Sequence, residues 1–350
     1  MNDRCENLSA VAAPLADRKL PSLAAALHAA TVRDRLVEHL PESELDGGAP
    51  GIELLKHTPG KRCVIAYDFA TRHGRRRVIG KLYRRERGQA IFANMRKLWQ
   101  AAQCATPRFH LPRPLAYVAE WGMVLQEAAP GIRADYLLHH GTFAQTVAAT
   151  ARNLAALHRL DLDLESRNTL ALHLQKYCHP GLEHLMADLP EARRRLAALA
   201  AQLLSDGSLA AMKRCPVHGD LGLTQIFHAE DHVSFIDFDG LCRSHAALDL
   251  CNFIIVLKTH LGRASDRMIA LFLEQYDRLR PLGEIEGVRQ YQALIYLRRA
   301  MIAWRHRLDR DWRAQALACL TAAEHALDQR RSFSDRHPAK VSFHLFGERA

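Results

Sequence analysis

Residues 218–225 read HGDLGLTQ, and residues 236–239 read IDFD. The short segments 225–227 and 233–238, which the polar turn 229–232 separates, predict a β-hairpin. Because a hairpin folds back on itself, it can bring Asp220 and Asp237 close together at one end of the hairpin. Carboxylates beside apolar strand residues cost desolvation free energy unless a cation or hydrogen-bond donors satisfy them. Each acid alone fits an ordinary turn or helix cap, but together they indicate a metal site or a polar network.

The sequence before this hairpin is rich in short strand-like runs. Residues 21–40 have helical spacing, and from residue 51 onward the period changes to that of β-structure. Three antiparallel strands in a meander, a helix and two further strands are predicted at 52–55, 63–69, 78–83, 88–101, 115–118 and 123–126. This part of the chain therefore predicts a small antiparallel sheet with one inserted helix.

Beyond Pro130 and Gly131 nearly every apolar pattern has the helical period, with the hairpin as the exception. Helices are expected over 143–157, 182–204 and 288–302. The fold class expected is α+β, with two lobes: a small antiparallel β-sheet lobe and a mainly helical lobe. The expected division is a helical prefix at 1–50, the β-rich lobe at 51–127 and the helical lobe at 128–340, with a hinge near 126–131.

Composition excludes several classes of protein. The 350 residues are 48% hydrophobic and 25% charged, which is ordinary globular usage and excludes a mainly disordered or collagen-like chain. The net charge of +10 favours anionic partners without choosing among them. Eight scattered cysteines form no C-x-x-C pair, so neither a disulfide scaffold nor a zinc ribbon is indicated, and a cytoplasmic location is expected. No apolar stretch is long enough to predict a membrane span.

The ordered set of motifs resembles the aminoglycoside phosphotransferase and choline kinase family, whose fold is that of the protein kinases. The family's catalytic loop, H-G-D-x-x-x-x-N, resembles 218–225, its I-D-[FW]-[DE] strand resembles 236–239, and its D-L-A-like segment resembles 249–250. Residues 154–158, LAALH, resemble a further family signature. The resemblance covers about residues 50–330 and implies a kinase that uses ATP and Mg²⁺ and phosphorylates the hydroxyl group of a small molecule.

The resemblance also implies a role for each residue of the helical lobe's site. Asp220 would accept or orient the proton of the acceptor hydroxyl, and Asp237 would bind Mg²⁺. Gln225 stands where the family has asparagine; its amide oxygen can still bind a hard cation, and a polar spacer is the alternative. His218 and Asp249 would support the loop rather than react. Asp239 fits a turn cap better than a second metal contact.

The β-rich lobe is expected to supply the nucleotide contacts. Lys81 lies in an apolar strand, where an ammonium group is costly unless it meets an anion such as a phosphate. A solvent-facing lysine on an edge strand is the alternative. The resemblance assigns Lys81 to the ATP phosphates and Gln126, Glu127 and Ala128 to the hinge that contacts the adenine. The turn 58–61 is the best candidate for a loop that covers the nucleotide, because no G-x-G-x-x-G motif is present.

Three departures from the family pattern keep other functions open. Gln225 replaces asparagine, the helix after Lys81 lacks its usual glutamate apart from nearby Glu86, and residues 243–245 read RSH where the family often has Gly-Asp-Pro. A catalytically weak nucleotide-binding relative is therefore the alternative, and a nucleic-acid-binding protein, supported only by net charge, is the third. Residues 161–215 show no acidic basin, which favours a neutral or weakly charged alcohol over an aminoglycoside as acceptor. No nucleic-acid or membrane partner is expected.

Overall fold

The computed structural model describes residues 16–40, 48–72, 74–205, 207, 209, 212–307 and 311–328, with the side chains of residues 85 and 86 excepted. These residues form two compact units. The first comprises the chain up to Trp99 together with Pro112–Ala129, and the second comprises Gln100–Leu111 and the chain from Pro130 onward. Each unit is described separately below.

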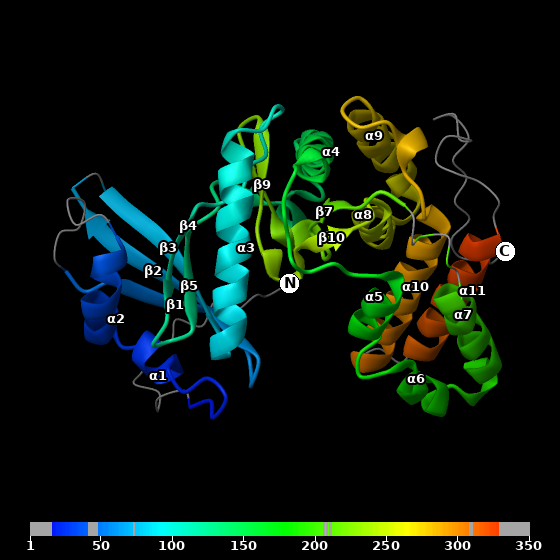
Figure 1. The fold of residues 1–350 in the computed structure, drawn as a ribbon, viewed down its shortest axis with the longest axis horizontal. Coiled ribbons are helices and arrows are strands. Elements are labelled where there is room, and N and C mark those ends of the chain that lie inside the picture. Colours follow the sequence, from blue (N-terminus) through cyan, green and yellow to red (C-terminus); the bar gives the residue numbers. More distant parts are fainter. Residues whose placement is uncertain are drawn as a thin grey trace. The chain divides into compact units, whose positions relative to one another are not determined.

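The first unit is built on a five-stranded antiparallel sheet with the order β1-β2-β3-β5-β4. As predicted, the first three strands form a meander, and a helix precedes the last two (Figure 1). The elements are β1 (Gly51–Thr58), β2 (Arg62–Thr71), β3 (Gly74–Tyr83), α3 (Arg85–Gln103), β4 (Pro114–Val118) and β5 (Met123–Glu127). The strands extend beyond the predicted ranges because the polar and charged residues at their ends also pair.

One face of this sheet is covered by the helical prefix, which contains α1 (Leu23–Ala26) and α2 (Ala29–Leu36). Prefix leucines and valine form one apolar core with alternate residues of β2, β3 and β5. Tyr67 lies in this core, and its hydroxyl donates a hydrogen bond to the carbonyl oxygen of Ala26 at 3.0 Å. The prefix therefore packs as part of the first unit, although the division expected from the sequence gave residues 1–50 as a separate segment.

The second unit is mainly helical. Its helices are α4 (Phe143–Arg159), α5 (Leu170–Tyr177), α6 (Leu182–Asp188), α7 (Arg193–Ser205), α8 (Ala247–Leu261), α9 (Ser265–Asp277), α10 (Val288–Arg305) and α11 (Trp312–Asp328). Of these, α4 and α10 lie where helices were predicted over 143–157 and 288–302. The single helix expected over 182–204 was wrong. Pro190 opens a short 3₁₀ turn between α6 and α7, since proline cannot donate the backbone hydrogen bond that a continuous helix requires.

The β-structure of the second unit is more extensive than predicted. The hairpin is present as β8 (Ile226–Ala229) and β9 (His232–Phe235), and β6 (Ile132–Arg133) pairs with β8 to make three strands. A separate pair joins β7 (Cys215–Val217) to β10 (Cys242–Ser244). These two- and three-residue strands are too short to show a period of two in the sequence.

The second strand of the hairpin ends earlier than expected. A strand to Phe238 was predicted, but β9 stops at Phe235, and Asp237 has φ 69° and ψ 56° in the left-handed region. This conformation is uncommon for a residue with a side chain and cannot continue a strand. None of the helices among the described residues combines the length and apolar composition needed to cross a lipid bilayer.

Candidate functional site

The loop that follows β7 carries His218, Gly219 and Asp220 and is fixed by a buried carboxylate. Asp249, in the first turn of α8, is fully buried and accepts hydrogen bonds from the backbone N–H groups of His218 at 2.7 Å and Gly219 at 2.8 Å. Gly219 has φ +81°, a conformation that glycine adopts without strain. Asp249 thus holds the backbone immediately before Asp220.

A buried histidine forms a further hydrogen bond with this carboxylate. His158, at the end of α4, is fully buried and donates from Nε2 to Asp249 at 3.1 Å, while its Nδ1 accepts a hydrogen bond from the hydroxyl of Tyr276 at 2.8 Å. Burial acts to raise the pKa of Asp249, but the hydrogen bonds from His158 and Gly219 outweigh it and hold that pKa below its usual value. Burial also lowers the pKa of His158, so a charged carboxylate faces a neutral imidazole.

His218 connects the two motifs that the sequence singled out. Its ring is buried, and Nε2 donates a hydrogen bond to the carbonyl oxygen of Ile236 at 2.9 Å. Ile236 directly precedes Asp237, and its own N–H donates to the carbonyl of Gln225 at 3.0 Å. One side chain and one backbone bond therefore hold the segments of Asp220, Gln225 and Asp237 together in the second unit.

Gln225 has its side chain turned back onto its own loop. It ends a 3₁₀ turn, Leu223–Gln225, and its Oε1 accepts a hydrogen bond from the N–H of Gly222 at 3.1 Å. An amide oxygen has two lone pairs, so this bond leaves one acceptor position on Gln225. The extra methylene relative to asparagine is what allows the side chain to reach three residues back.

Asp220 lies at the surface and contacts an arginine that sequence reasoning missed. Its Oδ1 forms an ion pair with Nη2 of Arg298 on α10, while more than half of the Asp220 side chain is exposed. Arg298 also donates to Asn252 Oδ1 at 3.3 Å, and its guanidinium lies 4.6 Å from the ring centroid of Tyr177. Burial acts to lower the pKa of Arg298, but the charge of Asp220 holds it above its usual value.

Two of the residues expected to bind a nucleotide share one face of the sheet in the first unit. Lys81 is 5% exposed and pairs with Val124, and Gln126 is 2% exposed and pairs with Ile79. Since Lys81 and Ile79 are two residues apart, all four side chains lie on the face opposite the prefix core. Among the residues that the structure describes, Gln126 Oε1 is buried without a hydrogen-bond partner. An orphaned buried acceptor on this face is costly unless a ligand supplies a donor.

The other predicted nucleotide contacts have partners within the first unit. The N–H of Glu127 donates a hydrogen bond to the backbone carbonyl oxygen of Arg113 at 2.9 Å. The N–H of Ala128 donates to the backbone carbonyl oxygen of Arg77 at 3.3 Å. The turn 58–61 is held by Asp17, whose Oδ2 accepts from the N–H of Gly60 at 2.7 Å. The side chain of Glu86 lies outside the described residues.

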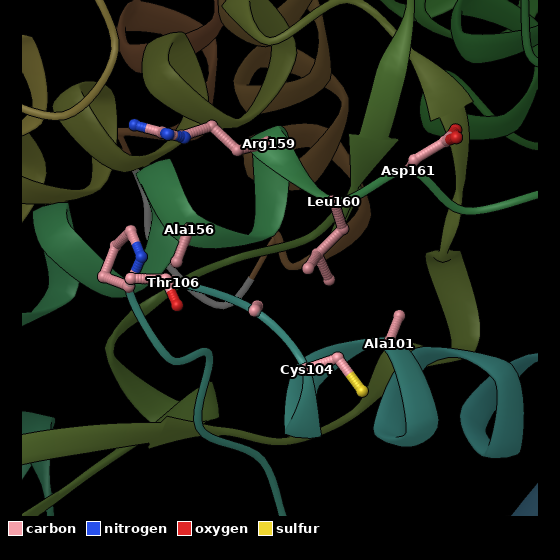
Figure 2. Close-up of a pocket in the computed structure, with 9 residues that line it drawn as sticks. Ala101, Cys104, Thr106, Ala156, Arg159, Leu160 and Asp161 are labelled. Carbon is pink, nitrogen blue, oxygen red and sulfur yellow. The ribbon is translucent and has the colours of Figure 1, made fainter.

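No group of three or more histidine, cysteine, aspartate or glutamate side chains able to hold a metal occurs within the described part of the chain. The second unit does contain a cavity of about 340 Å³, but none of the predicted site residues lines it. Its walls come from the end of α3, the segment that follows it and the end of α4 (Figure 2). A metal at the site described above would thus rest on Asp237, Gln225 and the ligands that a bound phosphate provides.

Comparison with solved structures defines the fold. Choline kinase LicA from Streptococcus pneumoniae aligns with a TM-score of 0.55 at 14% identity, covering 85% of this chain and 97% of that one. Aminoglycoside phosphotransferase APH(4)-Ia aligns with 0.56 at 15% identity, covering 86% and 98%. Amicoumacin kinase hAmiN, solved with AMP-PNP and Ca²⁺, aligns with 0.55 at 15% identity, covering 82% and 89%. The two units together therefore have the protein-kinase-like α+β fold.

The sequence profile of the phosphotransferase enzyme family matches residues 65–287, which is more than half of the chain. The protein accordingly belongs to the phosphotransferase enzyme family. A search of curated protein sequences gave no match. Membership supports a small-molecule kinase, as expected from the sequence, and leaves the acceptor and the reacting residues to be proposed.

Proposed function

We propose that the protein transfers the γ-phosphate of ATP, with Mg²⁺, to a hydroxyl group of a small molecule. The observation that carries the proposal is the double hydrogen bond from His218 and Gly219 to the buried carboxylate of Asp249. A fully buried charge is retained only where donors satisfy it, and here those donors are the loop that presents Asp220. Such a fixed loop suits a reaction in which the protein mainly positions its reactants.

Asp220 is proposed as the residue that accepts the proton of the acceptor hydroxyl. Its Oδ1 is held by Arg298, and more than half of the side chain remains accessible. Because Arg298 holds one carboxylate oxygen of Asp220, the second oxygen can receive a hydrogen bond from an incoming hydroxyl. His218 and Asp249 are proposed as positioning residues, because their hydrogen bonds act through the loop backbone.

The residues present fit a nucleotide and a hard cation. Buried Lys81 and the unsatisfied Oε1 of Gln126 share one sheet face, and we assign them to the phosphates and the base, with Glu127 and Ala128 completing the hinge. Asp237 and Gln225 offer the oxygen donors that Mg²⁺ prefers. When bound, Mg²⁺ would neutralise charge on the phosphate oxygens. The left-handed backbone of Asp237 is the kind of strained conformation that is concentrated at functional sites.

Replacing Asp220 tests this function directly. Asp220→Asn removes the proton acceptor and keeps the side chain's size, so phosphoryl transfer is expected to fall at least about a hundredfold. Mass spectrometry of a metabolite extract incubated with labelled ATP measures transfer, and a shift in melting temperature measures MgATP binding. MgATP should still stabilise the variant. An Asp220→Asn protein that transfers phosphate at the original rate would exclude Asp220 as the proton acceptor.

A catalytically weak nucleotide-binding relative remains the second candidate. The observation that favours it is the bond from Gly222 to Gln225 Oε1, which engages one of the two proposed metal-binding side chains within its own loop. This candidate predicts that MgATP stabilises the protein but that no compound of the metabolite extract becomes phosphorylated. Detection of one labelled product that depends on Asp220 would contradict it.

The compartment and the domain boundaries are also proposals. The seven described cysteines are all free thiols, which suits the reducing cytoplasm. We retain the division into a prefix at 1–50, a nucleotide-binding lobe at 51–127 and a catalytic lobe at 128–340 as functional segments.

A further inference from the structure

Arg298 is a mostly buried arginine that no sequence motif singled out. It lies on α10, which packs against α5 and α8 (Figure 1), and only 18% of its side chain is exposed. A buried guanidinium is costly unless it meets hydrogen-bond acceptors or an aromatic face. The guanidinium here meets three such groups: Asp220 Oδ1, Asn252 Oδ1 at 3.3 Å, and the ring of Tyr177, whose centroid lies 4.6 Å away.

Two of these partners also hold the backbone on either side of Asp220. The hydroxyl of Tyr177 donates a hydrogen bond to the carbonyl oxygen of Gly219, the residue before Asp220. Nδ2 of Asn252, a buried residue of α8, donates to the carbonyl oxygen of Leu221, the residue after Asp220, at 2.7 Å. The guanidinium is therefore fixed by the same side chains that fix the loop, so its position relative to the Asp220 backbone is set as well.

The second carboxylate at this loop has donors of its own among the described residues. Asp249 accepts hydrogen bonds from His158 and from the backbone N–H groups of His218 and Gly219. Its negative charge is thus satisfied by groups other than the guanidinium. The ion pair of Arg298 with Asp220 is a separate interaction, which acts on the side chain of Asp220 rather than on the loop backbone.

The side chain of Asp220 requires a contact of this kind because it lies at the surface. More than half of it is exposed, and an exposed carboxylate can rotate among its staggered χ1 conformations unless a contact selects one of them. A guanidinium selects by direction as well as by charge, because its N–H groups point along fixed lines in one plane. With Oδ1 on Arg298, the oxygen that remains for the acceptor hydroxyl is Oδ2.

We therefore propose that Arg298 is a positioning residue for phosphoryl transfer, which holds the carboxylate of Asp220 in one orientation relative to the loop. The proposal rests on the proposed function and adds to it a residue of α10. Displacing a reacting group by about 1 Å can cost about a hundredfold in rate. Arg298 should accordingly act on the rate of transfer and not on the binding of the nucleotide.

A split between kcat and KM tests this role. With labelled ATP and the acceptor that the metabolite extract supplies, Arg298→Met should lower kcat at least about tenfold, because methionine cannot hold Asp220. The KM for ATP and the rise in melting temperature with MgATP should stay unchanged. An original kcat in a folded Arg298→Met protein would overturn the proposal. A higher KM for ATP at unchanged kcat would also overturn it, because Arg298 would then serve the nucleotide.

A double variant distinguishes action through Asp220 from a general structural role. In Asp220→Asn the carboxylate on which Arg298 acts is already absent, so adding Arg298→Met should lower the remaining rate by less than about twofold. Two losses that multiply in full would show that Arg298 acts on another group, and the proposal would be wrong.

A conservative variant and a matched control complete the experiment. Arg298→Lys keeps the charge but lacks the planar fork, so its kcat should lie between those of the original protein and Arg298→Met. If urea denaturation shows that Arg298→Met is unfolded, a fall of at least about threefold in Arg298→Lys supports the proposal and an unchanged kcat contradicts it. Arg267→Met, at an exposed arginine of α9, is the control and should change neither kcat nor KM. Absence of any labelled product with the original protein would overturn the proposed function itself, and the role of Arg298 with it.

Discussion

At the scale of single residues, the second unit contains buried histidines whose burial favours the neutral ring. His158, His173 and His245 are buried, and burial lowers the pKa of each. His173 forms a hydrogen bond with Ser244 at 3.0 Å through Nε2, while its Nδ1 is buried and has no partner within the described part of the chain. Protonation of such a ring in the folded state is unfavourable because the new charge would have no solvent.

His173 therefore predicts a loss of stability in mild acid. Burial lowers its pKa from 6.5 to about 4, so between these values the unfolded chain binds a proton that the folded chain does not. The free energy of unfolding should fall as the pH drops through this window, by about 3 kcal/mol from His173. Urea denaturation between pH 7 and pH 4 should show that the free energy of unfolding depends less on pH for His173→Gln than for the original protein. The pH dependence that remains in the variant should come from His158 and His245.

The matched control is His260→Gln, at an exposed histidine near the end of α8. It should leave the pH dependence unchanged, because folding leaves this side chain exposed to water. If His173→Gln follows the original protein at every pH, the neutral state of His173 does not contribute to the acid sensitivity.

At the scale of elements, the loop between β7 and β8 depends on two glycines that approach each other. A Cβ on Gly219 would lie 2.8 Å from the carbonyl oxygen of Gly240, and the positive φ adds strain for any side chain. Gly240 belongs to the 3₁₀ turn that follows Asp237. The close approach of Gly219 and Gly240 thus links the loop of Asp220 to the segment of Asp237.

Gly219→Ala should accordingly destabilise the protein by about 1–3 kcal/mol and reduce phosphoryl transfer, because the backbone that presents Asp220 must move. Urea denaturation and the transfer assay measure the two effects. Gly141→Ala is the control, since a Cβ there meets nothing within 4 Å, and its change should stay within about 0.5 kcal/mol. Equal stability of the two variants would show that the loop relaxes without strain.

The elements also show how far the sequence could predict the fold. Long periodic segments such as 63–69 and 143–157 were predicted because each has an apolar face, and β2 and α4 occupy these positions. The strand pair β7 and β10 was missed because three residues carry no periodic signal. The contact of Asp220 with Arg298 was missed for a different reason: the residues are 78 positions apart, and an arginine on a helix is usually solvated. Only the three-dimensional packing of α10 against α5 reveals it.

At the scale of the whole molecule, the proposed function requires residues of both compact units to act on one ligand. Lys81 belongs to the first unit and Asp237 to the second. MgATP at a hundred times its Kd should stabilise the protein by about 2.7 kcal/mol. Lys81→Met and Asp237→Asn should each remove most of the rise in melting temperature that MgATP causes, because each removes a group proposed to bind its phosphates or its cation.

The double variant separates a shared ligand from two independent effects. If Lys81 and Asp237 bind the same MgATP, the second substitution has little stabilisation left to remove, so the losses should be far from additive. Lys56→Met, at an exposed lysine of β1, controls for the loss of a charge from the sheet and should respond to MgATP as the original protein does. Full stabilisation of Lys81→Met by MgATP would mean that the buried lysine stabilises the sheet rather than binding the nucleotide. The nucleotide site proposed in the first unit would then rest on Gln126, Glu127 and Ala128.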